Sequence, residues 1–131
     1  MRRLAVIVLF AVLAVPASAD AKRLVRYDVG GGLAGRSSTL IVDGGGTARQ
    51  TGNRSATKRF KVSATQLRAL KRELTAARFS SLKRTYRPAY TVADGITEVV
   101  TYKGRAVSVS TGAKVPKRLD RVLSRLARLM R

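Results

Sequence analysis

The stretch VRYDVGGGLAGRSSTLIVDGGG, Val25–Gly46, decides the fold. It contains the spacing of the dinucleotide fingerprint G-x-G-x-x-G at Gly30, Gly32 and Gly35. In a nucleotide site the third glycine opens a helix, and an acidic residue follows about 20 positions later. Here the segment after it, Arg36–Val42, is short and rich in Ser, Thr, Ile and Val, and basic residues stand where the acid is required. The run therefore predicts a tight turn between two antiparallel strands, and no nucleotide is expected as a ligand.

Such a turn would carry Leu33 and Ala34 at its tip, because glycine adopts the left-handed backbone conformations that a tight connection needs. The sequence is compatible with two orientations of the Leu33 side chain. Its side chain either tucks beneath the sheet or protrudes as an apolar tip for a pocket on a partner. The candidate binding segment consists of Gly31, Gly32, Leu33, Ala34 and Gly35.

Strands are expected on both sides of this turn. Apolar and polar residues alternate from Ala21 to Val29, which is the period of a half-buried strand. The β-branched run Arg36–Asp43 follows the turn and stops at Asp43-Gly44, a hairpin signal. By the same criteria, further strands are expected from Thr47 toward Thr51, over Lys58–Val62, over Ile96–Lys103 and over Ala106–Ser110.

Two helices complete the pattern. Ser63 and Gln66 form a capping box before an apolar stripe that predicts a helix to about Arg78. Pro116 suits the first turn of a last helix, whose apolar stripe ends at Met130. In residues 83–90 the apolar residues follow neither the helical nor the strand period, so this segment is expected to be a loop. The expected fold class is α+β, with an antiparallel β-sheet of about five to six strands and two helices packed on one face.

The first nineteen residues have the pattern of a secretory signal peptide. Two arginines precede a short apolar core, and a small-x-small cleavage site ends at Ala19. The apolar core is shorter than the roughly 20 residues that span a bilayer, so no transmembrane anchor is expected. We expect a single domain over residues 20–131, secreted or held in the cell envelope as a monomer. With no cysteine, it would depend on packing alone.

The formal net charge of the chain is +20, from 27 basic and 7 acidic residues. This surplus favours anionic partners such as envelope polymers, although a genome rich in Arg codons produces the same composition. The basic residues expected on the outer faces of the two helices form a candidate anion-binding surface: Arg68, Lys71, Arg72, Arg118, Arg121 and Arg125.

The sequence lacks most of the residue types that usually carry out catalysis. The chain has no His and no Cys, so the usual general base, thiol nucleophile and zinc ligands are absent. Asp94 and Glu98 are close in sequence, but an extended chain separates them by about 13 Å. We therefore expect a binding protein and not an enzyme, with no metal and no cofactor.

The order of these features resembles that of emfourin, the proteinaceous inhibitor of protealysin-type metalloproteases. The resemblance spans nearly the whole chain after the leader, and its most specific piece is the GGLAG segment. The features that carry it are Tyr27–Gly35, Asp43-Gly44-Gly45, the capped helix with Gln66-Leu67, Leu74, Ala77 and Phe79, then Asp94, the strand pair through Tyr102, and Pro116.

This resemblance implies a metalloprotease as the partner, and the signal peptide expected at residues 1–19 implies that the protease is secreted. A thermolysin-like protease has an apolar pocket that accepts Leu-like side chains, and a rigid turn offering Leu33 could fill it. The hypothesis is that Gly31–Gly35 enters the cleft and blocks substrate. The alternative is a cell-envelope protein that binds anionic polymers through the basic helical face.

Overall fold

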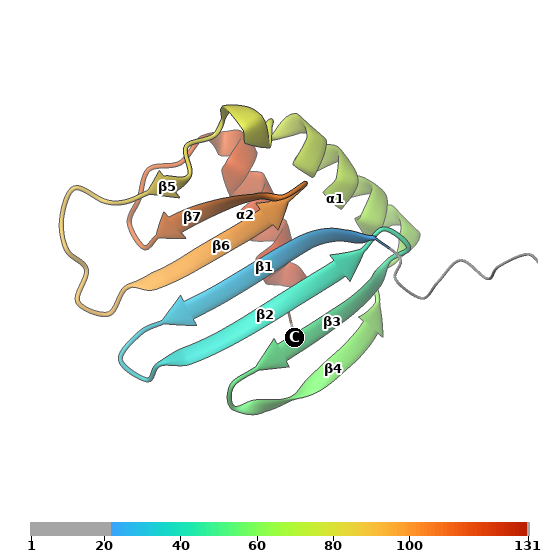
Figure 1. The fold of residues 1–131 in the computed structure, drawn as a ribbon, viewed down its shortest axis with the longest axis horizontal. Helices are drawn as coiled ribbons and strands as arrows, with labels where there is room; N and C mark the ends of the chain where they lie inside the picture. The colour runs from blue at the N-terminus through green and yellow to red at the C-terminus, as the bar shows by residue number, and fades with distance from the viewer. Residues whose placement is uncertain (1–21, 131) are drawn as a thin grey trace, which may run out of the picture.

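The computed structural model describes residues 22–130 and forms one sheet layer covered by one helical layer (Figure 1). The expected signal peptide, residues 1–19, lies outside the described residues. The class is α+β, as the sequence predicts. Among the described residues no helix is long and apolar enough to cross a membrane.

The sheet has seven strands in the order β4-β3-β2-β1-β6-β7-β5. Every neighbouring pair is antiparallel except β5 and β7, which are parallel. The strand bounds are β1 Arg23–Gly31, β2 Arg36–Asp43, β3 Thr47–Gly52, β4 Ser55–Lys61, β5 Thr85–Tyr86, β6 Ile96–Tyr102 and β7 Arg105–Ser110.

The expectation of a purely antiparallel sheet of five to six strands is therefore wrong. The additional strand is β5, which lies in the segment expected to be a loop. Two residues are too few to show a period, so sequence patterning cannot detect such a strand. Its pairing is set by tertiary contacts: Arg84 accepts a 2.8 Å bond from the Ser108 amide, and the half-buried Tyr86 ring packs against the core. β5 thus covers the edge that β7 would otherwise expose.

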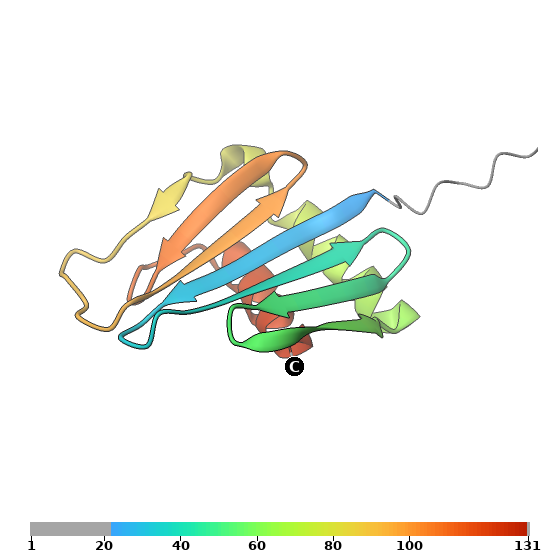
Figure 2. The same cartoon turned by 60° about the horizontal axis from the view of Figure 1, so that its bottom comes forward.

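Both helices, α1 Ala64–Ala76 and α2 Lys117–Leu129, lie on the same face of the sheet (Figures 1 and 2). The predicted cap of α1 is confirmed, because Ser63 Oγ accepts a 3.2 Å bond from the Gln66 amide. Pro116 is the N-cap residue of α2, one position before the predicted first turn. The core between the layers is built from these buried residues: Val25, Tyr27, Leu40, Val42, Ala48, Leu70, Leu74, Val100, Val107, Leu119, Val122 and Leu126.

Helix α1 and its C-cap residue Ala77 are followed by an arginine in an unfavourable backbone conformation. Arg78 has φ +50°, in the left-handed region that normally favours glycine. This conformation lets the short 3-10 helix η1, Phe79–Ser81, turn Phe79 into the core. The chain therefore carries a local strain that a glycine would relieve.

Replacing Arg78 with Gly is expected to raise the free energy of unfolding by about 0.5–1 kcal/mol, because the left-handed region costs a Cβ-bearing residue about 1–2 kcal/mol. Urea unfolding of the variant measures this gain. Arg78→Ala is the matched control, since it removes the same charge and keeps the strain. Equal stabilities of the two variants would contradict this account.

A polar pair lies on the helix-covered side of the sheet. Tyr27 is 1% exposed, and its hydroxyl donates to Glu98 Oε1 across the β1–β6 ladder. Burial, together with the hydrogen bond and the negative charge of Glu98, raises the pKa of Tyr27 above its ordinary value of 10.0. Because the folded state holds this proton more tightly, the pair stabilises the fold fully below pH 10 and loses that contribution as pH rises further.

The protein is therefore expected to lose stability above pH 10 with a slope approaching about 1.4 kcal/mol per pH unit from this group. The Tyr27→Phe variant has no hydroxyl to titrate at this position, so its free energy of unfolding should fall less steeply above pH 10. At pH 7 the variant is expected to be less stable than the wild-type protein. Chemical denaturation between pH 8 and pH 11.5 compares the two. Parallel pH profiles would exclude the proposed role of Tyr27.

Candidate functional site

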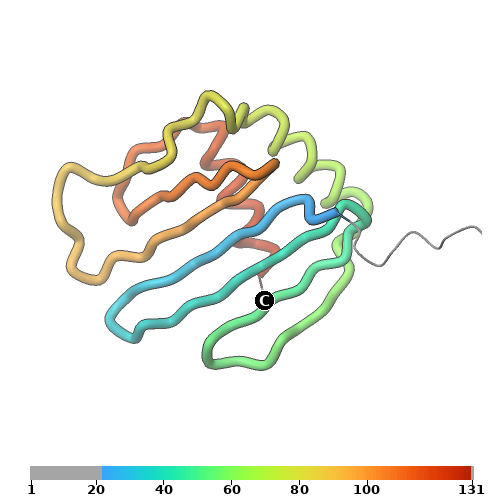
Figure 3. Tube along the Cα trace, viewed as in Figure 1, coloured from blue at the N-terminus to red at the C-terminus, as the bar shows by residue number. Residues whose placement is uncertain are grey.

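Three connections gather at one end of the sheet: the β1–β2 turn, the β3–β4 turn and the segment between β5 and β6 (Figure 3). The β1–β2 ladder continues as far as Gly31 opposite Arg36. The four residues between them form the turn, which is closed by a 3.1 Å bond from the Gly35 amide to the Gly32 carbonyl. No helix follows Gly35, because β2 begins at Arg36. The prediction of a hairpin turn is confirmed.

Leu33 protrudes from this turn. Its side chain is 89% exposed, the highest value among the exposed large hydrophobic residues that the structure describes. The alternative that Leu33 tucks beneath the sheet is therefore wrong. An exposed leucine gains nothing for the fold, since burying such a side chain is worth about 1.5–3 kcal/mol. Its position favours a role in contacts with another molecule.

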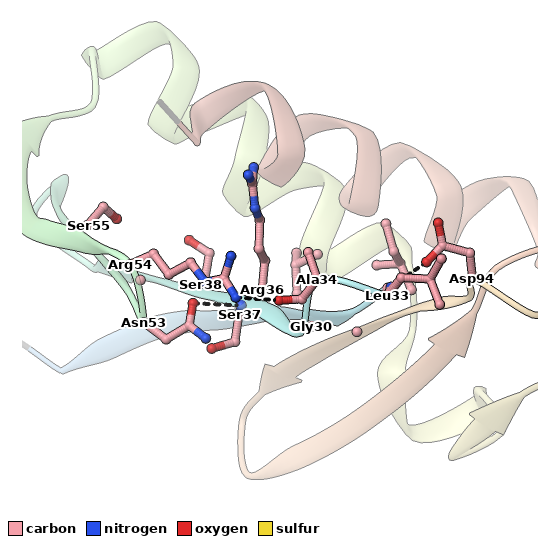
Figure 4. Close-up of a pocket in the computed structure, with 15 residues that line it drawn as sticks. Gly30, Leu33, Ala34, Arg36, Ser37, Ser38, Asn53, Arg54, Ser55 and Asp94 are labelled. Carbon is pink, nitrogen blue, oxygen red and sulfur yellow. Dashed lines mark hydrogen bonds between the residues drawn. The ribbon is translucent and has the colours of Figure 1, made fainter.

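The start of β6 holds one side of the turn. Asp94 Oδ1 accepts a 2.5 Å bond from the Leu33 amide (Figure 4). The Gly95 carbonyl accepts a 3.1 Å bond from the Gly32 amide. Gly31 has φ +112°, and a Cβ at this position would lie 2.7 Å from the Gly95 oxygen. Only glycine permits this close approach, which brings Asp94 within reach of Leu33.

The β3–β4 turn holds the other side. Asn53 Nδ2 donates to the Gly35 carbonyl at 2.9 Å, while its Oδ1 accepts from the Ser37 amide at 3.1 Å. Arg54 donates to the Ala34 carbonyl at 2.7 Å (Figure 4). The backbone of the turn is thus bonded from both neighbouring connections, while the side chains of Leu33 and Ala34 are exposed and available to a partner.

Other apolar side chains surround the tip. The exposed large hydrophobic residues of the described part of the chain are Leu33, Tyr90, which is 66% exposed, and Ile96, which is 45% exposed. All three line one hollow between the β1–β2 turn and the segment 87–97. We name Leu33, Tyr90 and Ile96 the apolar tip. Exposed apolar side chains gathered in one place are typical of an interaction site.

A second, mostly apolar hollow lies on the other side of Leu33, and Val29, Ala34 and Ile96 contribute to it. Two arginines line it. Arg54 is bonded to the turn, whereas Arg36 extends toward the helix-covered side of the sheet and forms no hydrogen bond or ion pair within residues 22–130 (Figure 4). The two hollows beside Leu33 therefore also offer the ring of Tyr90 and the guanidinium of Arg36, and Tyr and Arg are side chains enriched at binding hot spots.

The six residues of the candidate basic surface divide into two groups. Lys71, Arg118 and Arg125 bond within the protein. Lys71 donates to the Gly44 carbonyl at 2.9 Å, Arg118 to the Ala77 carbonyl at 2.8 Å, and Arg125 pairs with Glu73 at 2.5 Å. The hydrogen bond to Glu73 raises the pKa of Arg125. The other three residues, Arg68, Arg72 and Arg121, are exposed.

Asp94 and Glu98 do not form a carboxylate pair in the structure. Asp94 bonds to the Leu33 amide, and Glu98 accepts from the Tyr27 hydroxyl. No group of three or more potential metal ligands occurs among residues 22–130. Each of these carboxylates therefore has a structural partner.

Sequence reasoning identified the turn but not the residues that hold it. Asp94, Asn53 and Arg54 lie 61, 18 and 20 positions from their bonding partners in the turn. Asp94-Gly95 carried a turn signal, but nothing in it pointed to Leu33. Tyr90 and Ile96 reach the tip only because β6 pairs with β1.

Neither a protein-family model nor a curated protein matches this sequence.

Replacing Asp94 with Ala is expected to speed hydrogen exchange at the Leu33 amide by about tenfold or more, because it removes the charge-assisted acceptor. Exchange monitored by NMR measures the effect. Asp120→Ala, at an exposed position in the first turn of α2, is the control and should leave Leu33 unchanged. An unaltered Leu33 rate in Asp94→Ala would show that the clamp does not order the turn.

Proposed function

We propose that this protein acts by binding, as an emfourin-like inhibitor of a thermolysin-like metalloprotease. The observation that carries the proposal is the 89% exposed Leu33 on a turn bonded from both sides. The resemblance of the GGLAG segment and of the element order to emfourin supplies the class of target. Leu33 enters the apolar pocket of the protease, and the turn occupies the path of the substrate.

The geometry favours tight binding for an energetic reason. A flexible loop loses conformational freedom when it binds, whereas a turn already ordered by internal hydrogen bonds loses little. Burying Leu33 in a pocket contributes about 1.5–3 kcal/mol. Tyr90 and Ile96 widen the contact around it, because they line the hollow beside Leu33.

The net positive charge of the chain also favours a protease with an acidic surface as the partner. The excess of basic residues speeds association with an acidic protein, and this steering weakens as salt rises. Arg36 and Arg87 line the two hollows beside Leu33 and are available for acidic groups at the rim of a cleft. The signal peptide proposed for residues 1–19 places the encounter outside the cytoplasm, so the target is a secreted or envelope protease.

Binding of anionic polymers through the helices receives less support. Lys71, Arg118 and Arg125 already bond to the backbone or to Glu73. Three of the six candidate residues would therefore have to break internal bonds before they could contact the polymer. High salt separates the two functions. Polymer binding collapses as ionic strength rises, whereas a leucine in a pocket retains its affinity.

Leu33→Asp is expected to abolish inhibition of a thermolysin-like protease, because a carboxylate cannot enter an apolar pocket without a large desolvation cost. Thermolysin itself serves as the probe, with cleavage of a fluorogenic peptide measured at low and high salt. The thermal transition of the variant should match that of the wild-type protein, since Leu33 contributes no buried area.

Ser80→Asp is the matched control, because it adds the same charge at an exposed position of η1. It should inhibit as the wild-type protein does. Full inhibition by Leu33→Asp would remove the turn from the mechanism. Failure of the wild-type protein to inhibit any thermolysin-like protease would overturn the proposed function itself.

A further inference from the structure

The face of the sheet that points away from the helices carries three cations on the β3–β4 hairpin. Ala48 and Val62 are buried on the helix-covered side, so strand alternation places Arg49, Arg59 and Lys61 on the opposite face. All three are exposed. We name them the outer basic corner.

Arg49 and Arg59 are directly opposite each other in the β3–β4 register. Side chains at such positions have Cβ atoms about 4.5–5.5 Å apart, and like charges there destabilise the strand pair. Within residues 22–130 neither guanidinium forms a hydrogen bond or an ion pair. The register fixes the two backbones, so the repulsion cannot be relieved by moving the strands apart.

Within residues 22–130 the carboxylates on this face of the sheet already have partners. Asp43, at the end of β2, accepts bonds from the Gly45 amide at 2.9 Å and from the Thr47 amide at 3.0 Å. Asp28 lies on the same face of β1, but Arg26 binds it at 2.9 Å and Thr39 at 2.6 Å. Although burial raises the pKa of Asp28, these two hydrogen bonds and the charges of Arg26 and Arg23 together lower it. Asp28 is thus occupied, and the opposed arginines are left for an anion from outside.

The geometry indicates which anion fits. The directly opposed Arg49 and Arg59 together offer more N–H donors than the two oxygens of one carboxylate can accept, and a phosphate group supplies further acceptor oxygens. Lys61 lies two residues along β4 from Arg59, directly opposite Thr47, so it is on the same face and adds a third positive charge. Its ammonium group donates to Thr47 Oγ1 at 3.2 Å. A strip of cations suits a chain of phosphates better than a single ion.

The surroundings select among phosphate-bearing partners. The exposed large hydrophobic residues of the described chain are those of the apolar tip, at the far end of the strands. The outer basic corner therefore has no aromatic platform for stacking bases. The apolar neighbour on this face, Ile41 opposite Arg49, is only half-exposed within the sheet and does not protrude as a side chain that inserts into a bilayer would.

We propose that the outer basic corner binds a linear phosphate-containing polymer, with one phosphate bridging Arg49 and Arg59 and a neighbouring phosphate contacting Lys61. This surface is separate from the apolar tip, so the protein could bind such a polymer and a protein partner together. The proposal does not depend on the proposed function.

The test is binding of the protein to inorganic polyphosphate, followed by fluorescence anisotropy at low and moderate salt. Arg49→Gln/Arg59→Gln should weaken binding about tenfold or more, because it removes charge-assisted hydrogen bonds. The matched control, Lys83→Gln/Arg84→Gln, removes the same charge from exposed positions just before β5, at the opposite edge of the sheet, and should stay within about twofold of the wild-type protein. Thermal unfolding should give Arg49→Gln/Arg59→Gln an equal or higher Tm at low salt, because the repulsion is gone.

Three outcomes would overturn the proposal. Unchanged affinity of Arg49→Gln/Arg59→Gln would exclude the site. An equal loss in both double variants would show that binding follows net charge alone. Vesicles of anionic phospholipid that bind as tightly as polyphosphate at equal phosphate concentration would assign the surface to a membrane and not to a polymer.

Discussion

The close approach of two backbones at the end of the sheet is the constraint on which the site depends. Gly31 lies against the Gly95 carbonyl, and a Cβ there would come within 2.7 Å of that oxygen. This contact lets Asp94 reach the Leu33 amide, and it brings Ile96 beside the turn. Gly31 thus serves a packing requirement, because it lets β1 and the residues before β6 meet closely. Two of the glycines that match the nucleotide fingerprint, Gly32 and Gly35, instead adopt the positive φ angles of the turn that projects the leucine into solvent.

How much of the fold the sequence predicts depends on how far apart in the chain the interacting residues lie. Alternation predicted β1, β2 and the β6–β7 pair, and the capping box predicted α1, because these signals lie within a few residues of each other. The strand β5 escaped prediction because only its contacts with β7 make it a strand. The turn was predictable from glycine content, whereas the sequence left open whether Leu33 is buried or exposed. The clamps come from residues distant in the chain, which no local pattern connects.

The many cations of this chain do not have one role. Arg118 and Arg125 hold the two helices together through the end of α1 and through Glu73, and Arg54 bonds to the turn. Others, such as Arg49 and Arg59, have no anionic partner in the described part of the chain and oppose each other across two strands. The net charge alone cannot separate these groups, because composition does not record which guanidinium is bonded. The structure divides them into cations that stabilise the fold and cations available to a ligand.

A preorganised turn with an exposed leucine is the central claim, and ¹⁵N relaxation of the backbone amides tests it most directly. The account predicts that Leu33 and Ala34 have order parameters near the value of about 0.85 typical of rigid backbone, close to those of β1 and β2. Values below about 0.6 at these two positions, with ordered strands on either side, would contradict it. The turn would then be a flexible loop that becomes ordered only on contact, and its hydrogen bonds would not prepare Leu33 for binding.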